Sequence, residues 1–282
     1  MSVGPQAAWL PDGRRLHLNH GPIDLIVDAD GPAREAALAG AQTRFATLLS
    51  TLVQDLPALR RPIADAPVAA DPVARRMIEA AAPHAATFVT PMAAVAGAVA
   101  DEMLRALRAA GPLRRAYVNN GGDIAVHLAE GETFRALGPA GELRIEAGDA
   151  ARGIATSGRG GRSHSLGIAD AVTVAARSAA AADVAATLIA NAVDLPGHPA
   201  VQRRPARDLS PDSDLGERPA TTGLGFLSEA EVALALARGA ACARGMQDRG
   251  LILEAALSLR GQVVAIPRPA LVGRRQPQAL PA

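Results

Sequence analysis

The order of hydrophobic and polar positions predicts strands first and a long helix after them. Residues 8–28 contain short strand-forming runs separated by Pro-Asp-Gly and His-Gly-Pro, which are typical turn sequences. An antiparallel meander is therefore expected there. From residue 33 to residue 56, apolar side chains recur at three- and four-residue steps, at Leu38, Phe45, Leu48, Leu49 and Leu52. This spacing predicts an amphipathic helix that is ended by Pro57 and Pro62.

The middle of the chain changes from helical to strand-forming patterns. A short helix is predicted over residues 73–82, and a longer one runs from about residue 92 to residue 110, where Gly-Pro stops it. Strand-forming residues then flank the turn sequence Asn-Asn-Gly-Gly at 119–122, which predicts that two strands meet there. The segments LRIEAG and AVTVAA indicate further strands.

The last third of the chain predicts two helices and a final hairpin. An alanine-rich helix is expected over residues 180–193, and residues 196–219 are interpreted as a long, proline-rich surface excursion. A second helix begins at Ser228, which can form a capping box with Glu231. The segment LILEAALSLRGQVVAI after Gly250 predicts a hairpin of two strands.

The grouping of these elements indicates the fold class. Strands come in clusters instead of alternating singly with helices, which favours an α+β fold with antiparallel sheets and segregated helices. Residues 1–266 are expected to form a single domain. Residues 267–282 are proline-rich and basic without a periodic apolar face, so a loosely ordered tail is expected.

Composition and charge narrow the classes of function. The chain has 282 residues, of which 49% are hydrophobic and 20% charged, and these proportions are typical of globular proteins. Its formal net charge of +1 gives no broad field for nucleic acid or an anionic membrane, so neither is an expected partner. With one cysteine, Cys242, no intrachain disulfide forms.

Two features of the sequence bear on where the protein resides. The first ten residues lack the pattern of an export signal, from which we expect a cytoplasmic protein. The longest apolar stretch, residues 91–100, is too short to span a bilayer before acidic residues interrupt it.

Asp183 and Thr187 are candidate metal ligands. They stand four residues apart in a predicted helix, so their side chains share one face. A carboxylate and a hydroxyl suit Mg²⁺, which prefers oxygen and commonly bridges protein carboxylates to phosphates. The structural alternative is equally simple, because an Asp near a helix start complements the helix dipole and Thr often bonds back to a carbonyl.

Two glycine-containing segments are candidate ligand sites. In the first, Asn119, Asn120, Gly121, Gly122 and Asp123, the glycines allow close approach of a ligand to the backbone and the other residues supply polar groups. The same residues are also ordinary hairpin chemistry.

The second segment, ATSGRGGRSHS at 155–165, combines glycines with Arg159, Arg162 and His164, and its backbone amides could form an anion-binding nest. It lacks the order of a Walker A or Rossmann fingerprint. A solvated surface loop, with His164 as a surface residue, is the alternative interpretation.

Four motifs in order give the chain a resemblance to a known family. They are TPMAAVAG at 90–97, YVNNGGD at 117–123, ATSG at 155–158 and ADVAAT at 182–187. Together they resemble the ApbE family of FAD:protein FMN transferases, and within that superfamily the chain looks most like the UPF0280 proteins. The resemblance covers most of residues 10–265 and implies an ApbE-like, T-fold-related architecture.

The resemblance also implies roles for particular residues. Asp183 and Thr187 fall where the family holds Mg²⁺, aided by a backbone carbonyl from residues 93–97. The residues that fall on motifs bordering bound FAD are Asn119, Asn120, Gly121, Gly122, Ser157 and Gly158. Asp123 and His164 are the implied catalytic residues. In the implied reaction, a threonine hydroxyl of a partner flavoprotein attacks the FAD diphosphate, leaving FMN on the threonine and releasing AMP.

Two departures from the family pattern keep other functions open. Ala96 stands where typical transferases carry a lysine, although Asp101 is retained, and the family's His-x-x-Asp-Pro segment is contracted to residues 164–170. One alternative is a non-catalytic binding or assembly protein on the same scaffold. Another is an enzyme acting on a different phosphorylated small molecule through Arg159 and Arg162. Alanine- and glycine-rich helix surfaces also permit a homodimer.

Overall fold

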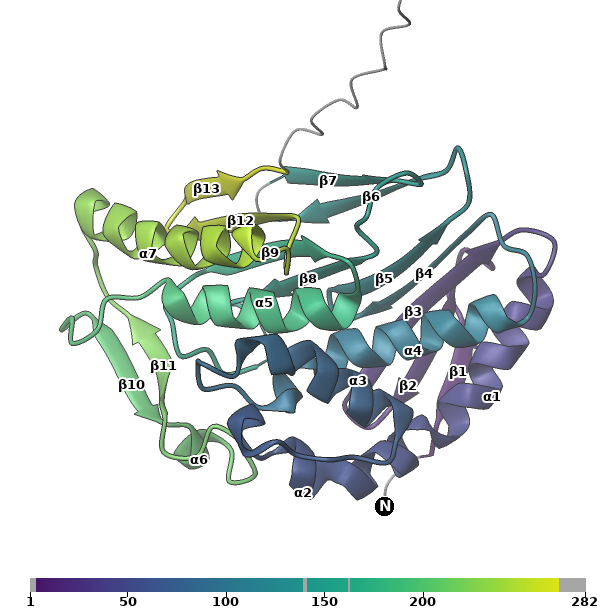
Figure 1. Cartoon of the computed structure of the whole chain (residues 1–282), viewed down its shortest axis with the longest axis horizontal. Coiled ribbons are helices and arrows are strands. Elements are labelled where there is room, and N and C mark those ends of the chain that lie inside the picture. The colour runs from purple at the N-terminus through teal and green to yellow at the C-terminus, as the bar shows by residue number, and fades with distance from the viewer. Residues whose placement is uncertain (1–3, 139–140, 162, 269–282) are drawn as a thin grey trace, which may run out of the picture.

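Strands of the computed structural model form one long antiparallel sheet with helices on one face (Figure 1). The structure describes residues 4–138, 141–161 and 163–268. Within them, nine strands form the main sheet in the order β1-β2-β3-β4-β5-β8-β9-β12-β13, and two further two-stranded sheets pair β6 with β7 and β10 with β11. Each pairing is antiparallel. The predicted fold class is therefore confirmed.

The elements have the following bounds. The strands are β1 (Gln6–Trp9), β2 (Leu16–His20), β3 (Ile23–Asp30), β4 (Arg115–Asn120), β5 (Asp123–Leu128), β6 (Thr133–Gly138), β7 (Gly141–Glu146), β8 (Gly153–Ser157), β9 (Ala171–Ala176), β10 (Val201–Pro205), β11 (Pro219–Leu224), β12 (Glu254–Leu259) and β13 (Gln262–Ile266). The α-helices are α1 (Arg34–Leu52), α2 (Leu56–Leu59), α3 (Pro72–Ala81), α4 (Val95–Ala109), α5 (Ala179–Ala192), α6 (Ala206–Leu209) and α7 (Glu229–Asp248). The 3₁₀ turns are η1 (Val53–Asp55), η2 (Ile63–Asp65), η3 (Ala82–His84) and η4 (Pro91–Ala94).

The predicted meander and hairpins are present. Strands β1 to β3 form the meander, and β12 and β13 form the final hairpin. Strand β4 pairs directly with β3, although helices α1 to α4 lie between them in the sequence. That helical segment therefore leaves the sheet and returns beside the strand it left, which brings η4 and the start of α4 over the β4–β5 hairpin.

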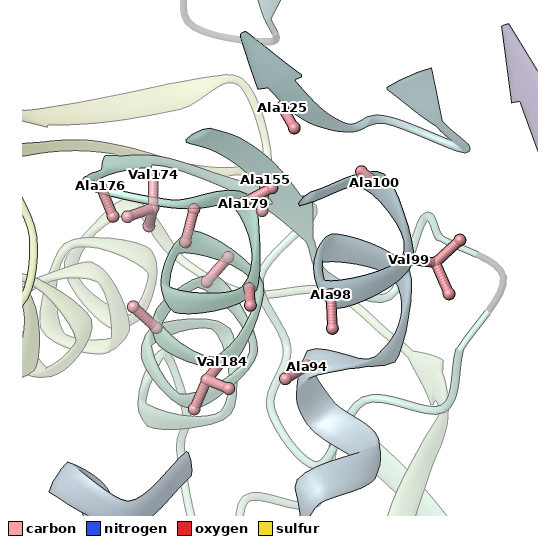
Figure 2. Packing of buried hydrophobic residues seen from close by; sticks show 14 of the residues in the cluster. Ala94, Ala98, Val99, Ala100, Ala125, Ala155, Val174, Ala176, Ala179 and Val184 are labelled. Carbon is pink, nitrogen blue, oxygen red and sulfur yellow. The ribbon is translucent and has the colours of Figure 1, made fainter. Parts of the chain in front are cut away.

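Four helices cover one face of the sheet (Figure 1). Helix α1 packs on β2 and β3, α4 on β4 and β5, α5 on β8 and β9, and α7 on β12 and β13. Helices α4 and α5 contact each other closely through buried alanines and valines (Figure 2). A Cβ added to Gly97 would lie 2.3 Å from the carbonyl oxygen of Ala179, so the crossing requires glycine there. Small side chains in close contact thus build the core of this aromatic-poor chain.

The β6–β7 hairpin packs on the opposite face of the main sheet. Its Ile145 is fully buried in a second hydrophobic cluster, which also contains Val126, Leu128, Ala151, Ile154 and Ala175. Phe134 on β6 packs against Tyr117 on β4, with ring centroids 5.4 Å apart. Neither β6 nor β8 was predicted, because their runs are short and lack clear alternation in the sequence.

The boundaries of some predicted elements differ from the structure. Helix α1 ends at Leu52, and helical turns continue through Pro57, which lies in the first turn of α2, where a missing N–H costs nothing. The interpretation of residues 196–219 as a long surface excursion was incomplete, because β10 and α6 lie within it and β11 begins at its end. Pairing of β10 with β11 satisfies the backbone of this segment.

The capping box predicted at Ser228 is confirmed: the Ser228 hydroxyl accepts from the Glu231 amide, and the Glu231 carboxylate accepts from the Ser228 amide. Of the predicted tail, residues 269–282 lie outside the described part of the chain. In the described part, no helix combines the length and apolarity needed to cross a bilayer.

Candidate functional site

The β4–β5 hairpin is closed by Gly121 and Gly122, both with positive φ (64° and 113°). Two central residues with positive φ match the right-handed twist of a tight hairpin, and glycine adopts them without strain. The Asn119 Oδ1 accepts a 2.8 Å hydrogen bond from the Gly122 amide, which fixes the turn. The hairpin interpretation of this motif is therefore correct, but it does not account for the side chains of Asn120 and Asp123.

Strand alternation divides the motif between the two faces of the sheet. Asn120 pairs with Asp123 across the hairpin, and both are buried on the side of the helices. The Asn120 amide donates to the carbonyl of Ala96, at 3.1 Å. Asn119 instead lines a cavity on the opposite face. The motif thus presents polar groups to both sides of one strand end.

Asp183 projects from α5 toward the start of α4. Its Oδ2 accepts a 3.0 Å hydrogen bond from the Gly97 amide. Burial raises the pKa of the Asp183 carboxyl well above its usual range, and the negative charge of Asp123 raises it further, against the opposing effect of the Gly97 and Ala96 amides. The structure therefore brings Asp183 and Asp123, 60 residues apart in the chain, within electrostatic reach of each other.

Thr187 lies one helical turn beyond Asp183 on α5 and is partly buried. The alternative interpretation of Asp183 as a residue that complements the helix dipole does not fit, because Asp183 is the fifth residue of α5. The first amides of α5 donate instead to the side chains of Asp101 and Ser178. Asp183 and Thr187 therefore remain together as an oxygen-bearing pair on one helix face.

Asp101 caps α5, which sequence reasoning did not foresee. Its two carboxylate oxygens accept from the amides of Ala179 (3.1 Å) and Ala180 (3.0 Å), and the Ser178 hydroxyl accepts from Ala181. Burial raises the pKa of the Asp101 carboxyl, while the two amides act in the opposite direction. Because Asp101 lies on α4, far away in the sequence, no local capping signal could have revealed this contact.

A cavity of about 430 Å³ lies on the other side of the hairpin, between the main sheet and the β6–β7 hairpin. Among the predicted site residues, Asn119, Gly121, Gly122 and Ser157 line it. A Cβ added to Gly122 would meet no atom within 4 Å, so the turn stands beside open space. The glycine turn therefore forms the boundary between the cavity and the Asp123–Asp183 pair.

The loop after β8 joins the same region. Gly158 has φ +143°, and a Cβ there would lie 2.7 Å from the carbonyl of Asp170, so the position requires glycine. The Thr156 amide donates to Asp123 Oδ1 at 3.3 Å. Ser157 and Gly158 thus lie beside the β4–β5 hairpin.

Arg159, the described arginine of this loop, is paired with a carboxylate. Arg159 donates two hydrogen bonds, of 2.9 and 2.6 Å, to Asp170 Oδ1, which neutralises its charge locally. Arg162 lies outside the described residues. His164 is exposed on the loop.

The oxygen-bearing groups near α5 fit a hard cation. Asp183 and Asp123 supply carboxylates and Thr187 a hydroxyl, the donor types that Mg²⁺ prefers. No group of three or more His, Cys, Asp or Glu side chains arranged to hold a metal occurs in residues 4–138, 141–161 and 163–268. A cation here would therefore be held by few protein carboxylates and completed by hydroxyl, carbonyl, water or ligand oxygens.

Comparison with known proteins assigns the chain to a family. The family model described as AbpE bacteria matches residues 7–265, and the chain belongs to this family. A UPF0280 protein of Methanosarcina acetivorans is 34% identical over 184 residues, covering 61% of this chain and 69% of that protein. The predicted resemblance is therefore confirmed at the level of the family.

Other relatives match over shorter stretches. UPF0280 proteins of Methanothrix thermoacetophila and Archaeoglobus fulgidus are each 39% identical, over 132 and 106 residues. These stretches cover 44% and 37% of this chain, and the chain spans about half of the relatives' length, 53% and 45% respectively. A crystal structure of apo Pseudomonas stutzeri flavinyl transferase ApbE superposes with a TM-score of 0.44 and 13% identity, covering 94% of this chain and 96% of that one.

Proposed function

We propose that this protein binds FAD together with Mg²⁺ and transfers FMN from FAD to a threonine of a partner flavoprotein. Family membership supports the flavin class, and a single structural observation carries the assignment to this site. That observation is the pair of carboxylates, Asp123 and Asp183, placed beside the glycine turn that borders the 430 Å³ cavity.

The electrostatics of the pair support a cation. Two neighbouring carboxylates in a partly dehydrated site repel each other, and the charge of Asp101 adds to the repulsion at Asp183. A divalent ion would remove this repulsion and would draw the phosphates of a ligand toward the turn. Asp183 and Thr187 are the residues proposed to hold it.

The cavity supports the flavin part of the proposal. Its volume lies within the range of small-molecule sites, about 300–1,000 Å³. Ile124, Leu143 and Ile154 give it apolar walls, and Asn119 and Ser157 add polar groups at its edge. A flat ring system bound there would place its phosphate chain at Gly121 and Gly122, where the backbone lies open.

The proposed chemistry assigns separate tasks to the residues of the chain. Asp123, held by the Thr156 amide, accepts the proton of the attacking threonine hydroxyl. The threonine oxygen bonds to the phosphorus of the FMN half, the bond to the AMP half breaks, and AMP leaves. When bound, Mg²⁺ supplies neutralisation of the charge that builds on the diphosphate.

A second candidate function, FAD binding without transfer, is favoured by two observations. The chain contains no lysine at any position, and Ala96 offers its carbonyl to Asn120 where typical family members carry a lysine. His164, the other implied catalytic residue, is exposed on its loop. A scaffold that has lost charge at the reaction centre retains binding more readily than catalysis.

Two measurements separate these functions. Quenching of flavin fluorescence during titration of FAD into the protein with Mg²⁺ tests binding, and chromatography of released AMP with threonine-bearing flavoprotein domains tests transfer. The Asp183→Asn variant is expected to bind FAD more weakly and to lose transfer, whereas Asp248→Asn, at the exposed end of α7, should change neither. Binding without AMP release would support the second function, and no FAD binding by the folded protein would refute both.

A further inference from the structure

A second cavity, of about 490 Å³, lies on the helix side of the sheet, near the end of β5. It is bounded by the second half of α4, the end of β5 and the start of α5. Five arginines from different parts of the chain line it: Arg76, Arg105, Arg108, Arg152 and Arg177. None of the family motifs includes these arginines, and the function proposed above does not use them.

The cavity is separate from the candidate flavin site. Strand β5 begins at Asp123, in that site, and reaches Leu128 in the cavity, a separation of about 16 Å at the rise of an extended strand. Helix α4 gives a similar span, because about 16 Å of helix separates Gly97 from Arg108. The end of β5 that lines the cavity is therefore distinct from the start that carries Asp123.

The charge of the cavity is strongly one-sided. Its lining contains five guanidinium groups and one carboxylate, that of Asp101, whose oxygens already accept from the amides of Ala179 and Ala180. The whole chain carries a net charge of only +1, so this is a local concentration of positive charge. Arginine rather than lysine also provides a planar fork that matches phosphate and carboxylate oxygens.

Two of the arginines are held in place by neighbouring groups. The buried Glu102 accepts two hydrogen bonds from Arg105, of 2.9 and 2.8 Å, and another from Arg44 at 2.8 Å. Arg152 donates to the carbonyls of Ala147 (2.6 Å) and Asp149 (2.7 Å). Guanidinium groups fixed in this way lose little further entropy when an anion binds.

The guanidinium group of Arg76 is incompletely hydrogen-bonded. Its Nη2 lies 3.5 Å from Glu102, whereas its Nε is buried without a hydrogen-bond partner in the described structure. A buried guanidinium nitrogen without a partner is uncommon in a finished protein interior. Arg108 and Arg177 complete the lining as exposed side chains that can turn toward a ligand.

The pKa of His127 is sensitive to the positive charge of the cavity. Burial lowers the pKa of the His127 imidazole, and the charges of Arg108 and Arg152 lower it further, against the opposing effect of a hydrogen bond to the Leu113 carbonyl. The imidazole therefore lies in a field that disfavours additional positive charge and favours a bound anion.

We infer that this arginine-lined cavity binds a small molecule that carries two or more linked phosphate groups. Arg76 and Arg105 share the carboxylate of Glu102, whereas the exposed Arg108 and Arg177 leave two guanidinium forks for the oxygens of linked phosphate groups. The volume of the cavity fits a nucleotide-sized molecule.

Isothermal titration calorimetry of the full chain with inorganic triphosphate and with ATP tests this inference. Mg²⁺ is left out, so that the acidic site does not attract the phosphates. Arg108→Gln and Arg177→Gln are each expected to weaken binding of both probes about tenfold, the usual effect of losing one charged hydrogen bond. Arg244→Gln, an exposed residue of α7 outside the cavity, is the matched control and should bind as the wild type does.

Three results bear on the outcome. Asp183→Asn should bind triphosphate normally, which separates this site from the proposed flavin site. Equal loss of affinity in Arg244→Gln and in the cavity variants would overturn the inference in favour of diffuse charge. Failure of both probes to bind, with binding of an acidic peptide instead, would also overturn it.

A spectroscopic readout locates the bound anion. Triphosphate beside His127 should raise the pKa of its imidazole, because a nearby negative charge favours the protonated form. The NMR signal of His127, assigned with His127→Gln, should therefore titrate at higher pH when triphosphate is present. An unchanged titration at saturating triphosphate would place the anion elsewhere and contradict the inference.

Discussion

On the helix side of the sheet, charged groups of opposite sign lie near the two ends of β5. At its start, Asp123 lies near Asp183 beside a glycine turn, with Asp101 adding negative charge. At its end, the strand forms part of a cavity lined by arginines, where Glu102 is surrounded by Arg44, Arg76 and Arg105. The helices above the strand, α4 and α5, pack on each other through small apolar side chains (Figure 2). A net charge of +1 therefore conceals two local fields of opposite sign.

The two ends also differ in how their charges are satisfied. Glu102 is buried among partners of opposite charge, and its carboxylate is held by direct hydrogen bonds. Asp183 accepts from backbone amides and faces another carboxylate, that of Asp123. The contacts of Glu102 stabilise the fold. Asp183 and Asp123 repel each other, and a bound ligand could compensate this repulsion.

The largest effect is expected for Glu102→Gln. Removing the buried carboxylate leaves three arginines without their common partner and should cost about 3–5 kcal/mol of unfolding free energy. Urea unfolding measures this loss. Glu142→Gln, at an exposed carboxylate of β7 that pairs with Arg135, is the control and should cost less than about 1 kcal/mol. Equal costs for both variants would contradict the difference between the two regions.

Lowering the pH of the wild-type protein should reproduce part of the loss of stability caused by Glu102→Gln. Burial opposes ionisation of Glu102, but the hydrogen bonds from Arg105 and Arg44 outweigh it and lower the pKa of Glu102 from 4.5 to about 2. Its stabilising contribution is therefore complete above pH 4.5 and is lost as the pH falls toward 2. Unfolding curves of Glu102→Gln should lack this component, and the wild type and the variant should converge in stability at low pH.

A change at the helix crossing comes next. Gly97→Ala places a methyl group 2.3 Å from the Ala179 carbonyl, so α4 and α5 must separate, at a cost of about 3 kcal/mol. Gly245→Ala on α7, where a Cβ meets nothing within 4 Å, should instead stabilise by about 0.5–1 kcal/mol. Thermal unfolding of the pair distinguishes crowding at the crossing from a general effect of replacing glycine.

Asp101→Ala should have a smaller effect. It leaves the first two amides of α5 without their acceptor and should destabilise the protein by about 1–2 kcal/mol. Asp101→Asn keeps one acceptor oxygen and should lose less. Hydrogen exchange at Ala179 and Ala180 provides the measurement, and unchanged protection in Asp101→Ala would show that the cap contributes nothing.

The smallest effect on stability has the opposite sign. Because the pKa of Asp183 is raised in the folded protein, its ionised form opposes folding, and its contribution to stability is lost as the pH rises through that pKa. Asp183→Asn should therefore stabilise the ligand-free protein at neutral pH by about 1 kcal/mol, a gain typical of relieving a functional site. A loss of stability would indicate a structural role for the carboxylate.

Local patterns in the sequence were sufficient for much of the fold. The β4–β5 hairpin, the cap at Ser228 and the helix that carries Asp183 each depend on neighbouring residues, and all are present. By contrast, β8 is a short strand with little alternation, and the cap of α5 comes from Asp101, far away in the chain. Contacts of this kind arise from tertiary packing and have no local signature.

The candidate site also combines features that local sequence patterns predict with features that arise only from tertiary packing. The motifs marked Asp183 and the residues of the hairpin as candidates, and the structure brings Asp183 and Asp123 within electrostatic reach of each other. The separation of Asn119 and Asn120 onto opposite faces follows from strand alternation, which a motif by itself does not describe. The arginine-lined cavity could not be predicted from the sequence, because its residues are scattered along the chain and form a group only after folding.

The most direct test of the proposed cation site is the dependence of FAD affinity on Mg²⁺, compared between the wild type and Asp183→Asn. If Asp183 holds the ion that bridges to the diphosphate, Mg²⁺ should tighten FAD binding by the wild type by at least about tenfold and should have no effect on the variant. An equal response to Mg²⁺ in both proteins, or wild-type binding that is independent of Mg²⁺, would contradict the assignment.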